Sequence, residues 1–236
     1  MRLFSKDNKV KTKEQRKHES MVFLKSHGIE PMKELPFIED GEKITLRSKE
    51  EVVKRAIGLL LISLYAEGLC TGEPRDNHRS WIETLIRQYS ARNFFTPKEK
   101  TFLENNQPPQ AESIHFSWQY EPLAVLLWSL GFLDMKDALS VPAEICDVPK
   151  VVNSVKVFQS YNKLYSHAVL RGREIILDQA DLIYRYDWVC VEDRIHNPEK
   201  HKMEWGIVMG RHKALNWLIN YGLDVPQDWD NVSTDT

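Results

Sequence analysis

Ionisable side chains recur at helical spacing within the otherwise apolar segment 174–194. They are Glu174, Asp178, Asp181, Arg185 and Glu192. On a helix these positions fall within a stripe less than about 90° wide, and apolar side chains cover the rest of the circumference. Such a helix is expected to be surrounded by protein, so its acidic stripe must either reach water or be supplied with cations.

One chemistry open to this stripe is metal binding. Glu174, Asp178 and Asp181 could supply oxygen ligands for Mg²⁺ or Mn²⁺, and Glu121 or His212 could complete the shell. His212 could also act as a general base, which would give a metal-dependent hydrolase for a phosphate-containing substrate. The sequence contains no HExxH, GxSxG, Walker A or GxGxxG motif.

The other chemistry is ion pairing inside the protein. Helical projection places Arg55 and Arg211 among apolar neighbours, and a buried arginine requires carboxylates or carbonyls because it keeps its proton. The simplest hypothesis brings Arg55, Arg185 and Arg211 together with the three acids of the stripe. Three interpretations remain open: a structural ionic network, a functional pocket containing these groups, or a solvated stripe. Because the arginines would compete for the carboxylate oxygens, we predict no tightly bound metal and no cofactor.

The elements that must position these residues are helical. Helix-type patterns and start signals predict helices in the segments that begin near Thr12, Ser48 and Thr96 and in 81–94, 122–133, 148–170, 174–194 and 205–221. Gly28 and Gly222 are expected to end the helices before them. The predicted fold is a single irregular all-α bundle of about seven or eight helices with an ordered C-terminal tail.

Composition excludes several functional classes. The 236 residues include 32 Lys and Arg and 34 Asp and Glu, so the formal charge of −2 offers no general attraction for nucleic acid or an anionic membrane. No apolar run approaches the ~20 residues that span a bilayer. We therefore predict a cytoplasmic protein with a basic tail over 1–14 and one helical domain over 15–236.

Cysteine and tryptophan patterns add two expectations. The three cysteines, Cys70, Cys146 and Cys190, are widely spaced, which favours reduced and mostly buried thiols over disulfides or a zinc site. Most tryptophans at helical spacing are expected in the core. Trp229 stands in a polar tail, where an isolated aromatic side chain predicts that the tail packs back onto the body of the protein.

Five separated segments resemble one known family. They are LRSKEEVVKRA near residue 46, WQYEPLAVLLWSLG, EIILDQADLIYR, GIVMGRHKALNWL and the terminal WDNVSTDT. In this order they look like the widespread bacterial domain of unknown function 4272, and the resemblance covers roughly residues 15–236. Where that family usually has Ala after the Glu of the second segment, this chain has Pro122, which predicts a helix start near Tyr120. The resemblance implies a helical domain and no established activity.

The predicted function is a non-catalytic binding or interaction protein with a protein partner, regulatory or immunity-like in role. An internal network of arginines and carboxylates would stabilise it. The alternative is the metal-dependent hydrolase that would use Glu174, Asp178, Asp181 and His212.

Overall fold

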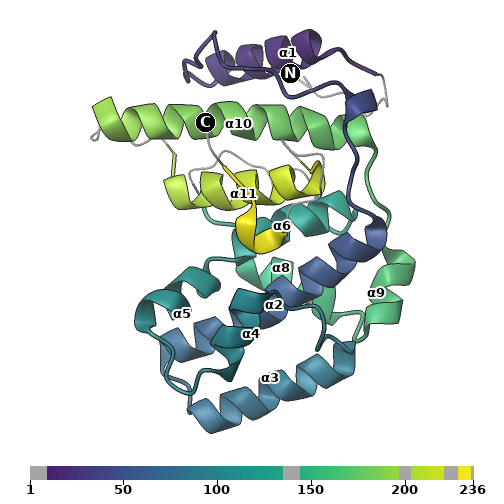
Figure 1. Ribbon diagram of the computed structural model, residues 1–236, viewed down its shortest axis with the longest axis vertical. Coiled ribbons are helices and arrows are strands. Elements are labelled where there is room, and N and C mark those ends of the chain that lie inside the picture. The colour runs from purple at the N-terminus through teal and green to yellow at the C-terminus, as the bar shows by residue number, and fades with distance from the viewer. Residues whose placement is uncertain (1–9, 135–143, 197–202, 221–227, 235–236) are drawn as a thin grey trace. The chain divides into compact units, whose positions relative to one another are not determined.

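The computed structural model describes residues 10–134, 144–196, 203–220 and 228–234 (Figure 1). The described chain is all-α, as predicted, and contains no strand in these ranges. It separates into two compact units, each of which is described by itself. The first unit joins Met1–Arg47 to Leu139–Ile145 and Arg171–Thr236, and the second contains Ser48–Ala138 and Cys146–Leu170. That 15–236 forms a single domain stays a prediction.

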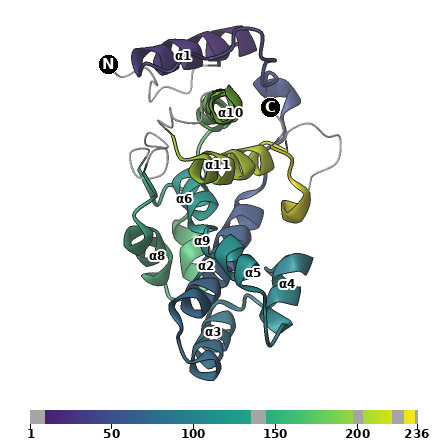
Figure 2. The ribbon, with the colours of Figure 1, turned by 90° about the vertical axis from the view of Figure 1, so that its left-hand side faces the viewer.

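The first unit is a stack of three helices. Helix α10 (Arg173–His196) lies between α1 (Lys13–Ser26) and α11 (Trp205–Leu218), which Figures 1 and 2 both show. Two short 3₁₀ turns, η1 (Gly41–Lys43) and η2 (Trp229–Asn231), complete its described elements. Because α10 has neighbours on two sides, most of its residues are buried, polar ones included.

The second unit is organised around one long helix. Helix α2 (Lys49–Thr71) is buried along most of its length and packs most extensively against α3 (Arg75–Tyr89), α5 (Gln110–Ser117), α6 (Tyr120–Ser129) and α9 (Tyr161–His167). Helices α4 (Pro97–Glu104) and α8 (Val148–Lys156) complete the described part of this unit, and α8 packs against α6. No helix of the described ranges is long and apolar enough to cross a membrane.

The predicted helix starts are confirmed. Thr12, Ser48 and Thr96 each accept a hydrogen bond from the backbone of the third helical residue, whose side chain reaches back to the cap. Helix α6 begins at Tyr120 with Pro122 in its first turn, where a missing N–H breaks no helical bond.

Several predicted boundaries were wrong. The helix predicted over 81–94 is α3, which begins at Arg75 and ends at Tyr89. The predicted helix over 148–170 is two helices, because Gln159 adopts a left-handed backbone (φ 58°) and Ser160 starts α9 by capping Lys163 N. Helix α11 ends at Leu218 instead of Gly222, and Asn220 (φ 48°) supplies the left-handed residue that follows it. Gly222 itself lies outside the described residues. Helix α5 lies where no helix was predicted, and the described residues contain more helices than the seven or eight expected.

Replacing Gln159 with glycine tests the break between α8 and α9. A non-glycine residue in the left-handed region is strained, so Gln159→Gly should raise the free energy of unfolding by about 0.5–1 kcal/mol in chemical denaturation. The matched control Gln110→Gly, in the first turn of α5, should lower it by up to about 1 kcal/mol. Equal destabilisation by both variants would contradict the assignment of strain to Gln159.

Candidate functional site

The face of α10 that meets α1 carries a cluster of opposite charges. Arg16 Nη2 lies 2.8 Å from Glu174 Oε2, and Arg16 Nε lies 3.4 Å from Asp178 Oδ1. Lys11 Nζ lies 2.7 Å from Asp178 Oδ2 and 2.6 Å from Glu19 Oε2. The cations for the first two acids of the stripe therefore come from the N-terminal segment.

Local sequence explains why these two cations point inward. Thr12 caps α1, so Lys11 stands immediately before the helix. Arg16, Ser20 and Leu24 follow at intervals of four residues and form the buried face of α1. Lys11 belongs to the segment that we predicted as a basic tail, yet its side chain is only 12% exposed. The capping signal at Thr12 placed this helix correctly, but the charge of Arg16 concealed its core position.

Among its described residues, the cluster contains more acids than cations. Glu19, Glu174 and Asp178 lie near Lys11 and Arg16, so these five side chains have a formal charge of −1. Burial raises the pKa of Asp178, and the charges of its two partners only partly oppose this effect. Burial lowers the pKa of Lys11, but its hydrogen bonds to Asp178 and Glu19 outweigh burial, so this pKa is raised.

These shifts have opposite meanings for stability. A raised pKa of Asp178 in the folded state means that the protonated carboxyl is favoured there, so its contribution is present at low pH and lost as pH rises through the folded pKa. The raised pKa of Lys11 means that its charged form is favoured, and that contribution is lost only at strongly alkaline pH. At neutral pH the cations stabilise the cluster, whereas the charge of Asp178 opposes folding.

The next turn of α10 contains a closed ion pair. Arg185 donates to Asp181 through Nε (2.9 Å) and Nη2 (2.6 Å), and both side chains are buried. The acid stands four residues before the base, which is the favourable order on a helix. Arg185 Nη2 also donates to Pro36 O at 3.4 Å, so the segment before η1 covers the pair. Burial and the nearby charge of Arg185 together lower the pKa of Lys17 on α1.

A series of hydrogen bonds links α10 to α11 and to the C-terminal tail. His212 Nδ1 lies 2.7 Å from Asp187 Oδ2, and His212 Nε2 lies 3.0 Å from Asn216 Nδ2. Asn216 Nδ2 also donates to Ser233 O at 2.9 Å. An amide nitrogen can only donate, so His212 Nε2 accepts and Nδ1 carries the proton that bonds to Asp187. Both ring nitrogens are therefore occupied, and neither is left to act as a base or a metal ligand.

Sequence reasoning missed Asp187. This residue is fully buried, but it lies away from the stripe of Glu174, on the side of α10 that meets α11. The sequence contained one signal for it. An aspartate within an apolar stretch of a central helix requires a hydrogen-bond donor, and His212 on the next helix was a candidate donor. Pairing the two required the knowledge that α10 and α11 are neighbours.

Arg211 faces the core, as predicted, with 1% of its surface exposed. Burial raises the pKa of Tyr186 on α10 to about 12, and the positive charge of Arg211 opposes part of this effect. The pairing of Arg211 with an acid of the stripe stays a prediction.

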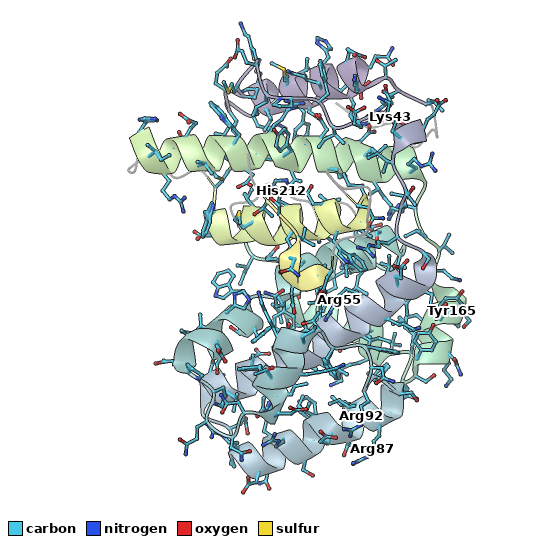
Figure 3. All side chains as sticks on the ribbon, viewed as in Figure 1. Lys43, Arg55, Arg87, Arg92, Tyr165 and His212 are labelled. Carbon is cyan, nitrogen blue, oxygen red and sulfur yellow. The ribbon has the colours of Figure 1, made fainter. Side chains whose placement is uncertain are left out.

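Arg55 and Glu121 belong to the second unit and have partners there. Arg55 does not need the stripe, because its Nη2 donates to both carboxylate oxygens of Glu99 at 2.7 and 2.8 Å. Glu99 also completes the capping box of α4, where its side chain accepts a hydrogen bond from the backbone N–H of the N-cap residue Thr96. Glu121 Oε1 accepts a hydrogen bond from Cys146 N at 2.6 Å. Figure 3 labels Arg55 and His212, one from each unit. That a single network joins Arg55, Arg185 and Arg211 to the acids of the stripe stays a prediction.

The described residues offer little for metal or thiol chemistry. Within the four described ranges, no group of three or more His, Cys, Asp or Glu is arranged to hold a metal ion. Cys146 and Cys190 are buried, whereas Cys70 is exposed. Burial, followed by nearby acids including Asp187, raises the pKa of Cys190 to about 12, so this thiol is protonated at neutral pH.

The C-terminal tail packs on α11. Trp229 is 4% exposed, and its ring lies 5.4 Å from that of Trp217 at an edge-on angle of 75°. Lys213 Nζ lies 5.2 Å from the centroid of the Trp229 ring. The predicted burial of Trp229 is confirmed, and the hydrogen bond from Asn216 to Ser233 O holds the segment that follows it.

The expectation that most tryptophans are core holds only in part. Trp128 and Trp217 are buried, but Trp118 and Trp205 are 45% and 41% exposed. Helix α5 directs Ser113 and Phe116 inward, which leaves Trp118 on its outer side. Trp205 begins α11 and packs against the guanidinium of Arg194, 4.7 Å from its ring centroid.

Together these observations define an all-helical protein whose charged interior is occupied by its own ion pairs. The chain belongs to the family described as domain of unknown function (DUF4272), whose model matches residues 16–232. The chain matches no curated protein and no solved structure.

Removing the buried cation of α1 should destabilise the protein strongly. Arg16→Met leaves Glu174 and Asp178 buried with one cation fewer, so the free energy of unfolding should fall by about 3–5 kcal/mol in urea at pH 7. Arg92→Met, which breaks the exposed pair with Glu83, should change it by less than about 1 kcal/mol. Asp178→Asn should be nearly neutral, and a loss as large as that of Arg16→Met would contradict the excess of acid in the cluster.

Truncating Trp229 tests whether the tail contributes to stability. Trp229→Ala removes a buried indole and should lower the free energy of unfolding by about 3–5 kcal/mol, measured in the same denaturation. Trp205→Ala, at an exposed tryptophan of the same unit, should lower it by less than half as much. If the two variants unfold alike, the tail is only a solvated extension.

Proposed function

We propose that this protein is a non-catalytic protein-binding module of the cytoplasm, regulatory or immunity-like in role. The observation that carries this proposal is the occupation of its candidate chemical groups. Glu174 and Asp178 bind cations of the N-terminal segment, Asp181 binds Arg185, and both nitrogens of His212 are engaged. Groups held in this way stabilise a fold and leave little capacity for turnover.

An exposed apolar pair on the second unit supports the same proposal. Ile114 and Trp118 are 46% and 45% exposed, and Trp118 N donates to Ile114 O, which places both on one side of α5. Tryptophan is among the residues that contribute most to protein interfaces. We infer that this pair belongs to the surface that meets a partner.

The test is affinity capture from the native host with the full-length chain, followed by mass spectrometry. The double variant Ile114→Ser/Trp118→Ser should reduce enrichment of the specific partner about tenfold or more, because it removes the interface centre. The matched control Val157→Ser/Val169→Ser changes two residues of the same unit that are 70% and 72% exposed, and it should leave enrichment unchanged.

Two results would contradict the proposal. One is the absence of any partner that depends on Ile114 and Trp118. The other is calorimetric binding of Mg²⁺, Mn²⁺ or Zn²⁺ at one ion per chain that is lost in Asp178→Asn, because this would favour the metal-dependent hydrolase.

A further inference from the structure

A groove of about 500 Å³ lies in the second unit where α2 and α3 meet. The last two turns of α2 and the first two turns of α3 form its walls, on either side of the turn that joins these helices (Figure 1). The carboxylates of Glu67 and Glu73 line it together with the polar side chains of Thr71, Asn77 and His78, and no lysine or arginine is among its described lining residues.

One wall of the groove is aromatic and locked in place. His78 Nε2 donates to Leu64 O and Tyr65 O at 3.1 and 3.2 Å, and the imidazole stacks on Tyr65 with ring planes 6° apart. The ring lies directly over Gly68, where a Cβ would come within 2.2 Å of it, so only glycine admits the ring at this position. Trp81 stands next to His78, with 5.5 Å between ring centroids, and is 40% exposed.

The carboxylates of the groove are partly preorganised, and no described residue supplies them with a counterion. Glu67 Oε2 accepts a hydrogen bond from Tyr120 OH at 2.7 Å, which orients this exposed side chain. Neither Glu67 nor Glu73 forms a salt bridge with a described residue, in contrast to the acids of α10. Two carboxylates beside an indole face form an arrangement that attracts a cation with an apolar stem.

The indole of Trp81 already attracts a cation of the chain itself. Lys156 Nζ, from α8 of the same unit, lies 5.7 Å from the ring centroid. This contact shows that the ring is oriented so that a positive charge can approach it, although 5.7 Å is near the outer limit for such an attraction.

We propose that this groove binds a lysine or arginine side chain from a basic segment of the partner protein. The proposal rests on the proposed function and names a site for it. The cationic head would lie between Glu67 and Glu73 while its methylene stem packs against Trp81. An anionic ligand would be repelled by both carboxylates, and a wholly apolar one would strip water from them without replacing it. Of the two cationic side chains, arginine also stacks on aromatic rings, so it is expected to bind more tightly.

The test uses the full-length chain and a capped tetra-arginine peptide as the probe. Calorimetry should show saturable binding that weakens with added salt, and the indole N–H resonance that is missing in Trp81→Leu should shift on titration. Glu67→Gln/Glu73→Gln should weaken binding about five- to tenfold, and Trp81→Leu about two- to fivefold. The glutamine at 67 can still accept from Tyr120, so the groove keeps its shape in the double variant.

The matched control removes the same charge elsewhere on the unit. Glu104→Gln/Glu112→Gln alters two exposed acids that do not line the groove, and it should leave the affinity unchanged. An equal loss in this control would overturn the proposal, because it would show general attraction to an acidic surface. Binding of a capped tetra-glutamate peptide would overturn it as well.

Two further measurements are needed. One distinguishes a partner side chain from a small cationic molecule as the ligand, and the other distinguishes failure of the groove assignment from failure of the binding function. Butylguanidine carries one guanidinium on a short alkyl chain and no second charge, and it should bind at least tenfold more weakly than the peptide; equal affinity would overturn the assignment to a partner side chain. If the peptide fails to bind while partner capture still depends on Ile114 and Trp118, the groove assignment falls and the binding function stands. If the peptide binds as expected and no partner is captured, the groove is upheld as a cation site and the binding function falls.

Discussion

The cost of burying charge governs the first unit of this protein. Helix α10 is enclosed by α1 on one side and α11 on the other, and it still carries Asp178, Asp181, Arg185 and Asp187 in buried positions. Each of these groups has at least one partner that offsets part of the cost of its burial. A removed partner would leave an uncompensated charge, so α1, α11 and the tail are fixed to α10 by electrostatics as well as by apolar packing.

The two sides of α10 solve this problem differently. On the side that faces α1, carboxylates pair with Lys11 and Arg16, and burial keeps the pKa of Asp178 raised despite these partners. Facing α11, a chain of hydrogen bonds runs from Asp187 through His212 and Asn216 to the backbone of the tail. The first arrangement depends on ionic interactions at the N-terminal segment. The second holds the C-terminal segment by directed bonds with fixed donors and acceptors, which is a more specific constraint.

The second unit carries acids both in its interior and on its surface. There the buried pair of Arg55 and Glu99 is closed, while Glu67 and Glu73 remain without salt bridges to described residues beside an exposed indole. A carboxylate that water solvates is inexpensive to keep unpaired, and it remains available to an external cation. The acids that stabilise the first unit are thus different from those that we propose for recognition.

The sequence by itself determined the helical class, the three capping boxes, the start of α6 at Tyr120, the pair of Asp181 with Arg185 and the inward position of Arg211. All of these follow from local spacing, since they depend on residues within about one or two helical turns of each other. Only the tertiary structure decided which cation reaches which acid. Lys11 and Arg16 meet Glu174 and Asp178 across more than 150 residues of chain, and Arg55 meets Glu99. Charge complementarity does not select a unique partner, because any buried arginine could pair with any buried carboxylate. The packing of the helices decides which two of them come into contact.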